Sequence, residues 1–181
     1  KYITDFTYTP TPAITYRVGG VVLKKELLWI HSRTQLLIRY TLLDARSDTQ
    51  LRLRPFLAFR DRHGLSKANL FADYPIPGGV RNRLYEGFPW LHMQMNVPCE
   101  FVAAPDWYYN FEYAEEIDRG YPGHEDLLTT GYFETDIVKG QSVIFSCSTE
   151  EVDPATLEKD FMEELARRSN KIDFLSCLRH S

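Results

Sequence analysis

Short segments of strand-forming residues, separated by glycine and proline turns, recur along the first 150 residues of the chain. Gly19-Gly20 separates residues 14–18 from 21–30, and this two-residue spacing predicts a β-hairpin. A second hairpin is predicted where Lys139-Gly140-Gln141 separates residues 132–138 from 142–148. Further strands are expected at 35–43, 51–59, 80–85, 91–97 and 100–104. About nine short strands at this spacing indicate a mainly β fold, a sandwich or a barrel.

The pattern changes after Glu150, where helical periodicity replaces the short strands. Asp153 is a suitable N-cap with Pro154 behind it, and an amphipathic helix is predicted from Pro154 to Ser169. Asn170 could end this helix, and a second short helix is expected after it. The apolar stripe of the first helix consists of Leu157, Phe161 and Leu165. We expect this stripe to be buried on the β-domain or on a following domain. The second helix would carry Ile172, Leu175 and Leu178. The expected organisation is a β-domain at 1–150 followed by a helical linker at 151–181.

Charge and cysteine content exclude several classes of protein. The net charge of −4 argues against a nucleic acid or an anionic membrane as partner, because both require a basic surface. No run approaches 18 apolar residues, so no membrane span is encoded. Three widely spaced cysteines without a CxxC motif predict reduced thiols in a cytoplasmic protein. The first residue is Lys rather than Met, so we expect the true N-terminus to lie upstream.

Residues 105–134 combine many aromatic rings with carboxylates and one arginine. No helical or strand period runs through 114–130, so this part is predicted to be a long loop, and such loops are usually functional. Rings can cover the apolar faces of a sugar while charged groups bond its hydroxyls. An alternative is that the rings pack into the core of the domain. The candidate substrate-binding residues are Trp107, Tyr108, Tyr109, Arg119, Glu125 and Asp126. Arg119 could instead be structural, forming an ion pair with Glu125 or Asp126.

No catalytic residue can be assigned from motifs. Glycoside hydrolysis needs two carboxyl groups roughly 5–10 Å apart, and Glu115/Glu116 and Glu125/Asp126 are the available pairs. Adjacent acidic residues are more often a solvated loop. The five histidines show no metal-ligand spacing, and His63 in its charged loop is more simply a hydrogen-bonding residue than a base. Nucleophile-elbow, dinucleotide-binding and P-loop motifs are absent, so neither a metal nor a cofactor is expected.

Several blocks of sequence match one family in the same order. Two of them are residues 39–45 and 51–60, and the others lie in the ring-rich stretch, at 105–108, 112–113, 119–121, 125–127 and 131–134. These blocks resemble the N-terminal domain of bacterial and archaeal glycogen debranching enzymes. The likeness runs from about Tyr16 to Thr149, and several blocks in one order are more specific than any single block.

The resemblance implies a supersandwich of the galactose-mutarotase-like type and amylo-α-1,6-glucosidase action on glycogen-like α-glucan. In such enzymes the activity belongs to a helical (α/α)6 barrel that follows the sandwich, and Ser181 lies about where that barrel would start. From the resemblance we also expect the chain to begin part-way into the family's sandwich. We therefore expect the catalytic acid and base outside this chain, with α-glucan and the barrel of the same polypeptide as its partners. In related two-domain glycosidases a sandwich loop reaches toward the active site of the barrel, and 105–134 is the best candidate here.

Two other hypotheses about the function stay open. A free-standing carbohydrate-binding domain or a mutarotase-like epimerase would have the same class of fold, and the epimerase would need a His/Glu pair on inward-facing strands. His92 and Glu134 lie on predicted strands, but nothing in the sequence pairs them. The other hypothesis is a purely structural interaction module.

Overall fold

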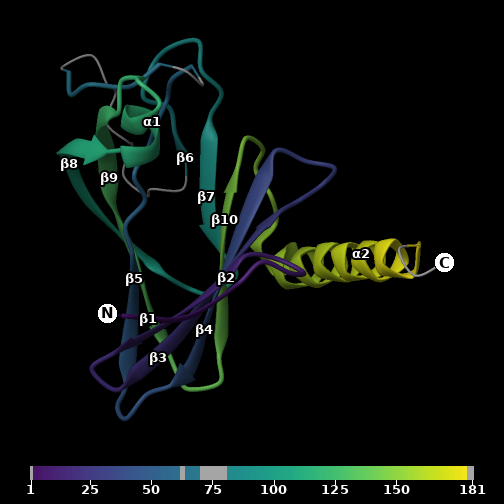
Figure 1. Ribbon diagram of the computed structural model, residues 1–181. Coiled ribbons are helices and arrows are strands. Elements are labelled where there is room, and N and C mark those ends of the chain that lie inside the picture. The colour runs from purple at the N-terminus through teal and green to yellow at the C-terminus, as the bar shows by residue number, and fades with distance from the viewer. Residues whose placement is uncertain (1, 62–63, 70–80, 179–181) are drawn as a thin grey trace. The chain divides into compact units, whose positions relative to one another are not determined.

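The computed structural model describes residues 2–61, 64–69 and 81–178 (Figure 1). They form two antiparallel sheets and one long C-terminal helix, so the predicted mainly β fold with a helical tail is confirmed, in agreement with the sandwich class. The chain divides into two compact units. Unit 1 comprises residues 1–51, 92–98 and 135–181, and unit 2 comprises residues 52–91 and 99–134. Among the described residues, no helix is long and apolar enough to cross a membrane.

The strands of unit 1 run side by side in one antiparallel sheet. Their order is β1 (Ile3–Thr7), β2 (Ala13–Val18), β3 (Val21–Trp29), β4 (Gln35–Asp44), β10 (Ser142–Ser148) and β7 (Leu91–Met95). The predicted Gly19-Gly20 hairpin is confirmed, because Val18 is paired with Val21 across the turn. Both glycines have positive φ, as a two-residue hairpin turn requires.

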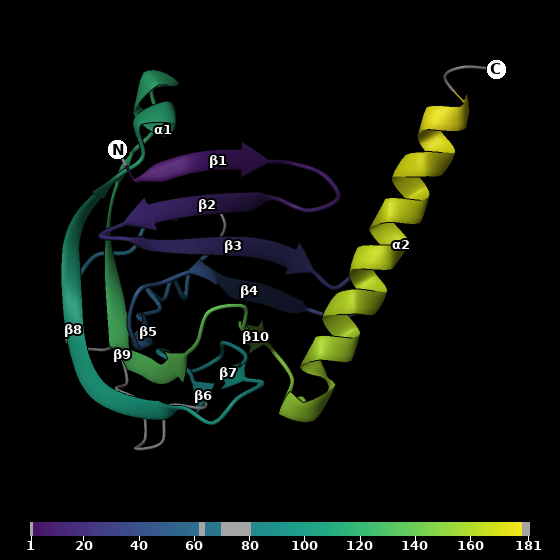
Figure 2. The same cartoon turned by 90° about the horizontal axis from the view of Figure 1, so that it is seen from below.

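The helix α2 (Leu157–Leu178) packs on this sheet and completes the core of unit 1. Figure 2 shows it beside the end of β3, where Arg168 donates to the carbonyl of Trp29 over 2.7 Å. Its stripe residues Leu157 and Phe161 are fully buried, and Leu165 packs against the same cluster; the remaining members of that cluster are Leu28, Ile30, Leu37, Ile144 and Val152. The predicted burial of the stripe is therefore confirmed, and it takes place on the sheet of unit 1.

An ion pair extends the contact between α2 and the sheet. The guanidinium of Arg39 lies 4.2 Å from the centre of the Phe161 ring, and the carboxylate of Glu26 accepts from Arg39 over 2.8 Å. The pKa of Glu26 is lowered, because the hydrogen bonds and charges of Arg39 and Lys24 outweigh the effect of burial. Arg39 therefore covers the outer face of a core ring while its own charge is compensated.

The second sheet lies mostly in unit 2, in the order β5 (Thr49–Leu53), β9 (His124–Ile137) and β8 (Glu100–Glu112). The short helix α1 (Ala114–Asp118) joins β8 to β9, and β6 (Arg81–Asn82) is a two-residue strand of unit 2 that is not part of this three-stranded sheet. β8 carries two register irregularities, one beside Pro105 and one beside Asn110, whose φ is 57°. Bulges suit both residues, because proline has no N–H for the ladder and asparagine tolerates positive φ.

Four sequence-based expectations are wrong. The predicted loop at 114–130 is instead α1 followed by β9. Four successive residues of β9, 127–130, are buried, so burial on both faces removes the alternation that would have marked a strand. The strand predicted at 51–59 ends at Leu53, before Pro55, and only Leu57 makes a further bridge, to Leu128.

The second predicted hairpin is also absent. Gly140 reverses the chain with φ of 86°, but β9 and β10 belong to different sheets. The backbone of this turn instead exchanges hydrogen bonds with Leu42 of β4, at 2.8 Å to Gly140 and 3.0 Å to Gln141. Finally, Asn170 does not end the helix, and the tail is one helix to Leu178, because no glycine or proline interrupts it.

The remaining expectations are confirmed in part or fall outside the described residues. Asp153 caps the helical tail as predicted, accepting from the N–H of Ala155 over 2.9 Å at the start of a 3-10 turn, Pro154–Thr156. Cys99 and Cys147 are free thiols. The strand predicted at 80–85 is reduced to β6, and the loop expected at 64–79 is described only at 64–69. Outside the described residues lie His63, Val80, residues 70–79, and the side chains of Leu175, Cys177 and Leu178.

The packing of α2 predicts a large loss of stability for Phe161→Ala. The ring is fully buried, so its removal should lower the free energy of unfolding by about 3–5 kcal/mol. Chemical denaturation measures the change. The matched control is Met162→Ala. Met162 is next to Phe161 in the sequence but half exposed, so its truncation should lower the free energy of unfolding by less than about 1 kcal/mol. Equal losses in the two variants would contradict this packing.

Candidate functional site

The turn between β8 and β9 is built by two glycines. Gly120 ends α1 with φ of 82°, donating to the carbonyl of Ile117 over 2.9 Å. Gly123 then brings the backbone back beside the helix, where a Cβ atom would lie 2.3 Å from Ile117 Cγ1. The chain closes with a hydrogen bond of 2.8 Å from the N–H of Tyr113 to the carbonyl of Gly123. Residues 113–123 therefore form a compact tip, which we call the hairpin tip.

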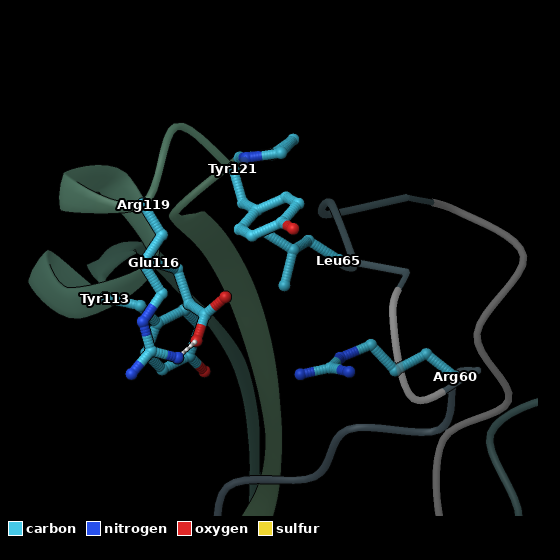
Figure 3. Close-up of a pocket in the computed structure, with 7 residues that line it drawn as sticks. Arg60, Leu65, Tyr113, Glu116, Arg119 and Tyr121 are labelled. Carbon is cyan, nitrogen blue, oxygen red and sulfur yellow. Dashed lines mark ion pairs between the residues drawn. The ribbon is translucent and has the colours of Figure 1, made fainter.

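A cleft of about 640 Å³ lies between the hairpin tip and the side chains of Arg60 and Leu65. We call it the tip cleft. It combines two tyrosine rings with a carboxylate and two guanidinium groups, and its lining residues are Arg60, Leu65, Tyr113, Glu116, Arg119, Tyr121 and Pro122. Figure 3 shows Arg60 pointing toward Tyr113 and Glu116 from the opposite wall, and the ring of Tyr121 beside Leu65. All of these residues belong to unit 2.

The buried carboxylate of Glu125 supports one wall of the cleft. Glu125 is fully buried, and its two oxygens accept from Arg60 Nη2 over 3.1 Å, from Tyr113 Oη over 2.7 Å and from the N–H of Ser66 over 3.0 Å. Burial alone would raise its pKa, but the bonds to Arg60, Ser66 and Tyr113 and the charge of Arg60 hold the pKa below its usual value. Glu125 is therefore ionised at neutral pH and cannot act there as a general acid.

The carboxylate of Glu125 raises the pKa of both side chains that donate to it. The pKa of Tyr113 is raised, first by its hydrogen bond to Glu125 and then by burial. The pKa of Arg60 is raised by its hydrogen bond to Glu125. Tyr113 is thus held as a neutral donor and Arg60 as a cation, so this side of the cleft has fixed protonation states.

Asp126 fixes the backbone on the other face of β9. Its oxygens accept from the N–H of Ala68 over 3.0 Å and from the N–H of Asn110 over 2.9 Å. These two bonds are the main reason that its pKa is lowered. Asp126 therefore holds the bulge of β8 and the segment beside Ala68 in place, and it does not line the tip cleft.

Arg119 is the most exposed charged residue of the cleft. Its guanidinium lies 3.5 Å from the carboxylate of Glu116, and the two side chains are 64% and 46% exposed. Exposed pairs of this kind contribute only about 0–1 kcal/mol, so either group can turn to a ligand at little cost. The ion pair of Arg119 with Glu125 or Asp126 that the sequence suggested is not formed, because Glu116 is its partner.

The six residues predicted to bind substrate are not gathered in one place. Arg119 lines the tip cleft, while Glu125 and Asp126 lie buried in β9. Tyr109 is 63% exposed on β8, and the Tyr108 hydroxyl accepts from Arg54. The indole Nε1 of Trp107, also on β8, is buried and has no hydrogen-bond partner among the described residues. Their role in sugar binding stays a prediction.

Two lining residues, Arg60 and Leu65, are not singled out by the sequence, and Glu116 is named there only as part of a carboxylate pair for hydrolysis. Tyr113 and Tyr121 belong to the ring-rich stretch, but no reason to prefer them was visible there. The turn signals Gly120 and Pro122-Gly123 could have indicated the hairpin tip. No local signal could have predicted that Arg60 lies beside the hairpin tip, because Arg60 and its partner Glu125 are 65 residues apart in the sequence.

The other acidic candidates lie outside the lining of the tip cleft. Glu134, half of the His/Glu pair that an epimerase would need, forms an ion pair with Arg52 over 2.5 Å. Glu115 is exposed on α1 beside Glu116. Within the described part of the chain, no group of three or more His, Cys, Asp or Glu side chains could hold a metal ion.

A comparison with protein families shows which family the chain belongs to. The family model described as "Glycogen debranching enzyme N terminal" matches residues 1–144. The chain belongs to this family. The match includes the whole hairpin tip and every residue that lines the tip cleft, whereas α2 follows it. No curated protein matches the chain. The family resemblance inferred from short sequence blocks is therefore confirmed for this debranching enzyme N-terminal domain.

The Glu125 network predicts a stability effect that depends on pH. Glu125→Gln should lower the free energy of unfolding by about 2–3 kcal/mol at neutral pH, somewhat below the cost of breaking a fully buried pair, because Arg60 is partly exposed. The folded-state pKa of Glu125 lies below 4.5, so its contribution is present above pH 4.5 and is lost as the pH falls through the folded-state value.

Denaturation at several pH values measures this effect. The difference between Glu125→Gln and the unaltered chain should shrink as the pH falls below 4.5. The matched control is Glu112→Gln, an exposed residue of β8 that should change stability by less than about 0.5 kcal/mol. A pH-independent difference would show that the carboxylate charge is not what holds this network.

Proposed function

We propose that this domain is a non-catalytic part of a glycogen debranching enzyme, and that it shapes the substrate cleft from the hairpin tip. Hydrolysis of α-1,6-glucosidic branch points would be performed by a downstream (α/α)6 barrel of the same polypeptide, in the cytoplasm. The observation that carries the proposal is the tip cleft, with its rings and charged hydrogen-bonding groups, in a chain of this family.

The composition of the tip cleft suits a neutral polyhydroxylated ligand. Tyr121 is 63% exposed, and its ring offers an apolar face to a sugar ring. Arg119 can donate to hydroxyls and Glu116 can accept from them, while Arg60 adds a second guanidinium on the opposite wall. The volume of about 640 Å³ falls within the range of small-ligand sites. A few sugar units of an α-glucan are the occupant that we propose.

The carboxyl groups support a binding role rather than a hydrolytic one. Glycoside hydrolysis needs one carboxyl group with a raised pKa to protonate the leaving group. Among the described residues, every carboxyl group with a shifted pKa is shifted downward; these are Glu26, Asp44, Glu125, Asp126 and Glu164. The general acid is therefore proposed to lie in the barrel.

A second candidate is a carbohydrate-binding domain that works without a barrel. The observation in its favour is that all residues lining the tip cleft belong to unit 2, so the cleft needs no other part of the chain. The two candidates differ in whether the isolated domain binds α-glucan oligosaccharides, which titration of this chain can measure.

The isolated chain is expected to release no reducing sugar from α-1,6-branched glucan. The physical reason is that every described carboxyl group with a shifted pKa is shifted downward, away from the raised pKa that a general acid needs. A reducing-sugar assay on the purified chain measures this directly, with Glu125→Gln as the reference variant. Release of sugar that Glu125→Gln abolishes would overturn the non-catalytic assignment.

In an enzyme that joins this domain to the barrel, Tyr121→Ala and Arg119→Ala should each reduce turnover on branched glucan. A ring that covers a sugar face contributes about 1–3 kcal/mol, so the reduction should be about 5- to 150-fold for Tyr121→Ala. The melting temperature should be nearly unchanged, because both side chains are exposed. Tyr109→Ala tests the sequence-based prediction for β8 in the same assay.

Tyr8→Ala is the matched control, since Tyr8 is at least as exposed as Tyr121 but lies in unit 1. Unaltered turnover in both Tyr121→Ala and Arg119→Ala would refute a role of the tip cleft. A large fall in melting temperature would assign these residues a structural role instead.

A further inference from the structure

Two arginines of unit 2 converge on a single tryptophan outside the tip cleft. The guanidinium carbon of Arg81 lies 4.9 Å from the ring centre of Trp90, and that of Arg83 lies 4.6 Å from it. Arg81 is exposed, while Arg83 and Trp90 are partly exposed. We call these three side chains the Arg-Trp-Arg cluster.

The local backbone explains why both arginines are on one side. From Arg81 to Leu84 the burial alternates: Asn82 and Leu84 are each 1% exposed, and the two arginines lie between them on the outer face. This is the pattern of an extended segment, which begins in β6 (Figure 1). Burial of Asn82 and Leu84 therefore directs both guanidinium groups to the surface.

The turn that follows brings Trp90 back to these arginines. Phe88 donates its N–H to the carbonyl of Tyr85 over 3.4 Å, and the rings of these two residues are 6.3 Å apart. Phe88 also packs edge-on against Phe59, at 6.0 Å between ring centres. Asn69 donates to the Tyr85 hydroxyl over 2.8 Å. The turn between Arg83 and Trp90 is therefore itself fixed by ring packing and hydrogen bonds.

The positive charge of the cluster is not compensated by the described part of the chain. No carboxylate among the described residues forms an ion pair with Arg81 or Arg83. Three other arginines of unit 2 pair with acidic side chains, Arg52 with Glu134, Arg60 with Glu125 and Arg119 with Glu116, whereas Arg54 contacts the rings of Tyr108 and Tyr132. The whole chain is acidic, with a net charge of −4, so two uncompensated cations on one ring need a local reason.

We propose that the Arg-Trp-Arg cluster binds a phosphomonoester group. Each guanidinium presents a planar fork of donors that matches two oxygens of a phosphate group. Stacking on the indole limits the orientations of both forks, so less freedom is lost when the ligand binds. Two cations suit the dianionic charge of a phosphomonoester better than the single charge of a carboxylate. This site does not depend on glucan binding at the tip cleft.

The test is isothermal titration calorimetry of the full chain with three probes. Inorganic phosphate and glucose 6-phosphate should bind with saturable heats that weaken as the salt concentration rises, and glucose should give none at this site. Tighter binding of glucose 6-phosphate than of inorganic phosphate would identify a phosphate carried by a sugar. Equal binding of the two would identify the phosphate group alone as the ligand.

The double variant Arg81→Gln/Arg83→Gln should weaken both phosphate probes at least about tenfold. Arg46→Gln, which removes an exposed arginine of unit 1, is the matched control and should change the affinity less than about twofold. Circular dichroism checks that each variant is folded, and the single variant Arg81→Gln replaces the double variant if the latter is not. Absence of saturable phosphate binding, or equal affinity in the double variant and the unaltered chain, would overturn the proposal.

Discussion

The buried carboxylate of Glu125 joins three separate segments of unit 2. It accepts from Arg60 and Ser66 on one segment and from Tyr113 at the hairpin tip, while its own backbone belongs to β9. A buried charge of this kind is stable only when its partners are in place, because desolvation otherwise penalises the ionised form. The walls of the tip cleft are therefore positioned by a group that a ligand need not touch. An acidic residue can in this way shape the tip cleft without lining it.

The sequence predicts the fold of unit 1 better than that of unit 2, and the reason lies in how each sheet is buried. In β2 to β4, glycine turns and strand-forming residues mark the elements directly, and Gly19-Gly20 identifies its hairpin. In β9 the residues 127–130 are all buried, so polar threonines and apolar leucines follow one another without alternation. The turn at Gly140 shows a second limit of prediction from sequence. A local signal predicts that the chain reverses there, but not which strand the next strand pairs with.

The sequence predicts the region that contains the candidate site, but not the residues that line it. Composition indicated a stretch rich in rings and charges, and the hairpin tip does lie within it. Which residues face the cleft depends on Arg60 and Leu65, which reach it from a distant part of the sequence. Glu125 and Asp126 were proposed as sugar ligands because carboxylates beside rings suggest carbohydrate chemistry. Their burial and their bonds to backbone N–H groups give both of them a role in holding the structure, and their role in sugar binding stays a prediction. Membership of the debranching enzyme family then gives the cleft its proposed ligand.

The position of β10 in the sheet of unit 1 has a consequence for the order in which the chain folds. Strands β1 to β4 are consecutive neighbours and can pair through short loops, whereas Thr41 of β4 and Ser142 of β10 are 101 residues apart. Closing so long a loop costs more entropy and slows the pairing. Until β10 arrives, β4 has an open edge whose backbone groups can pair with a strand from another molecule. The apolar stripe of α2 packs partly on Ile144 of β10, so this part of its cover also depends on the late step.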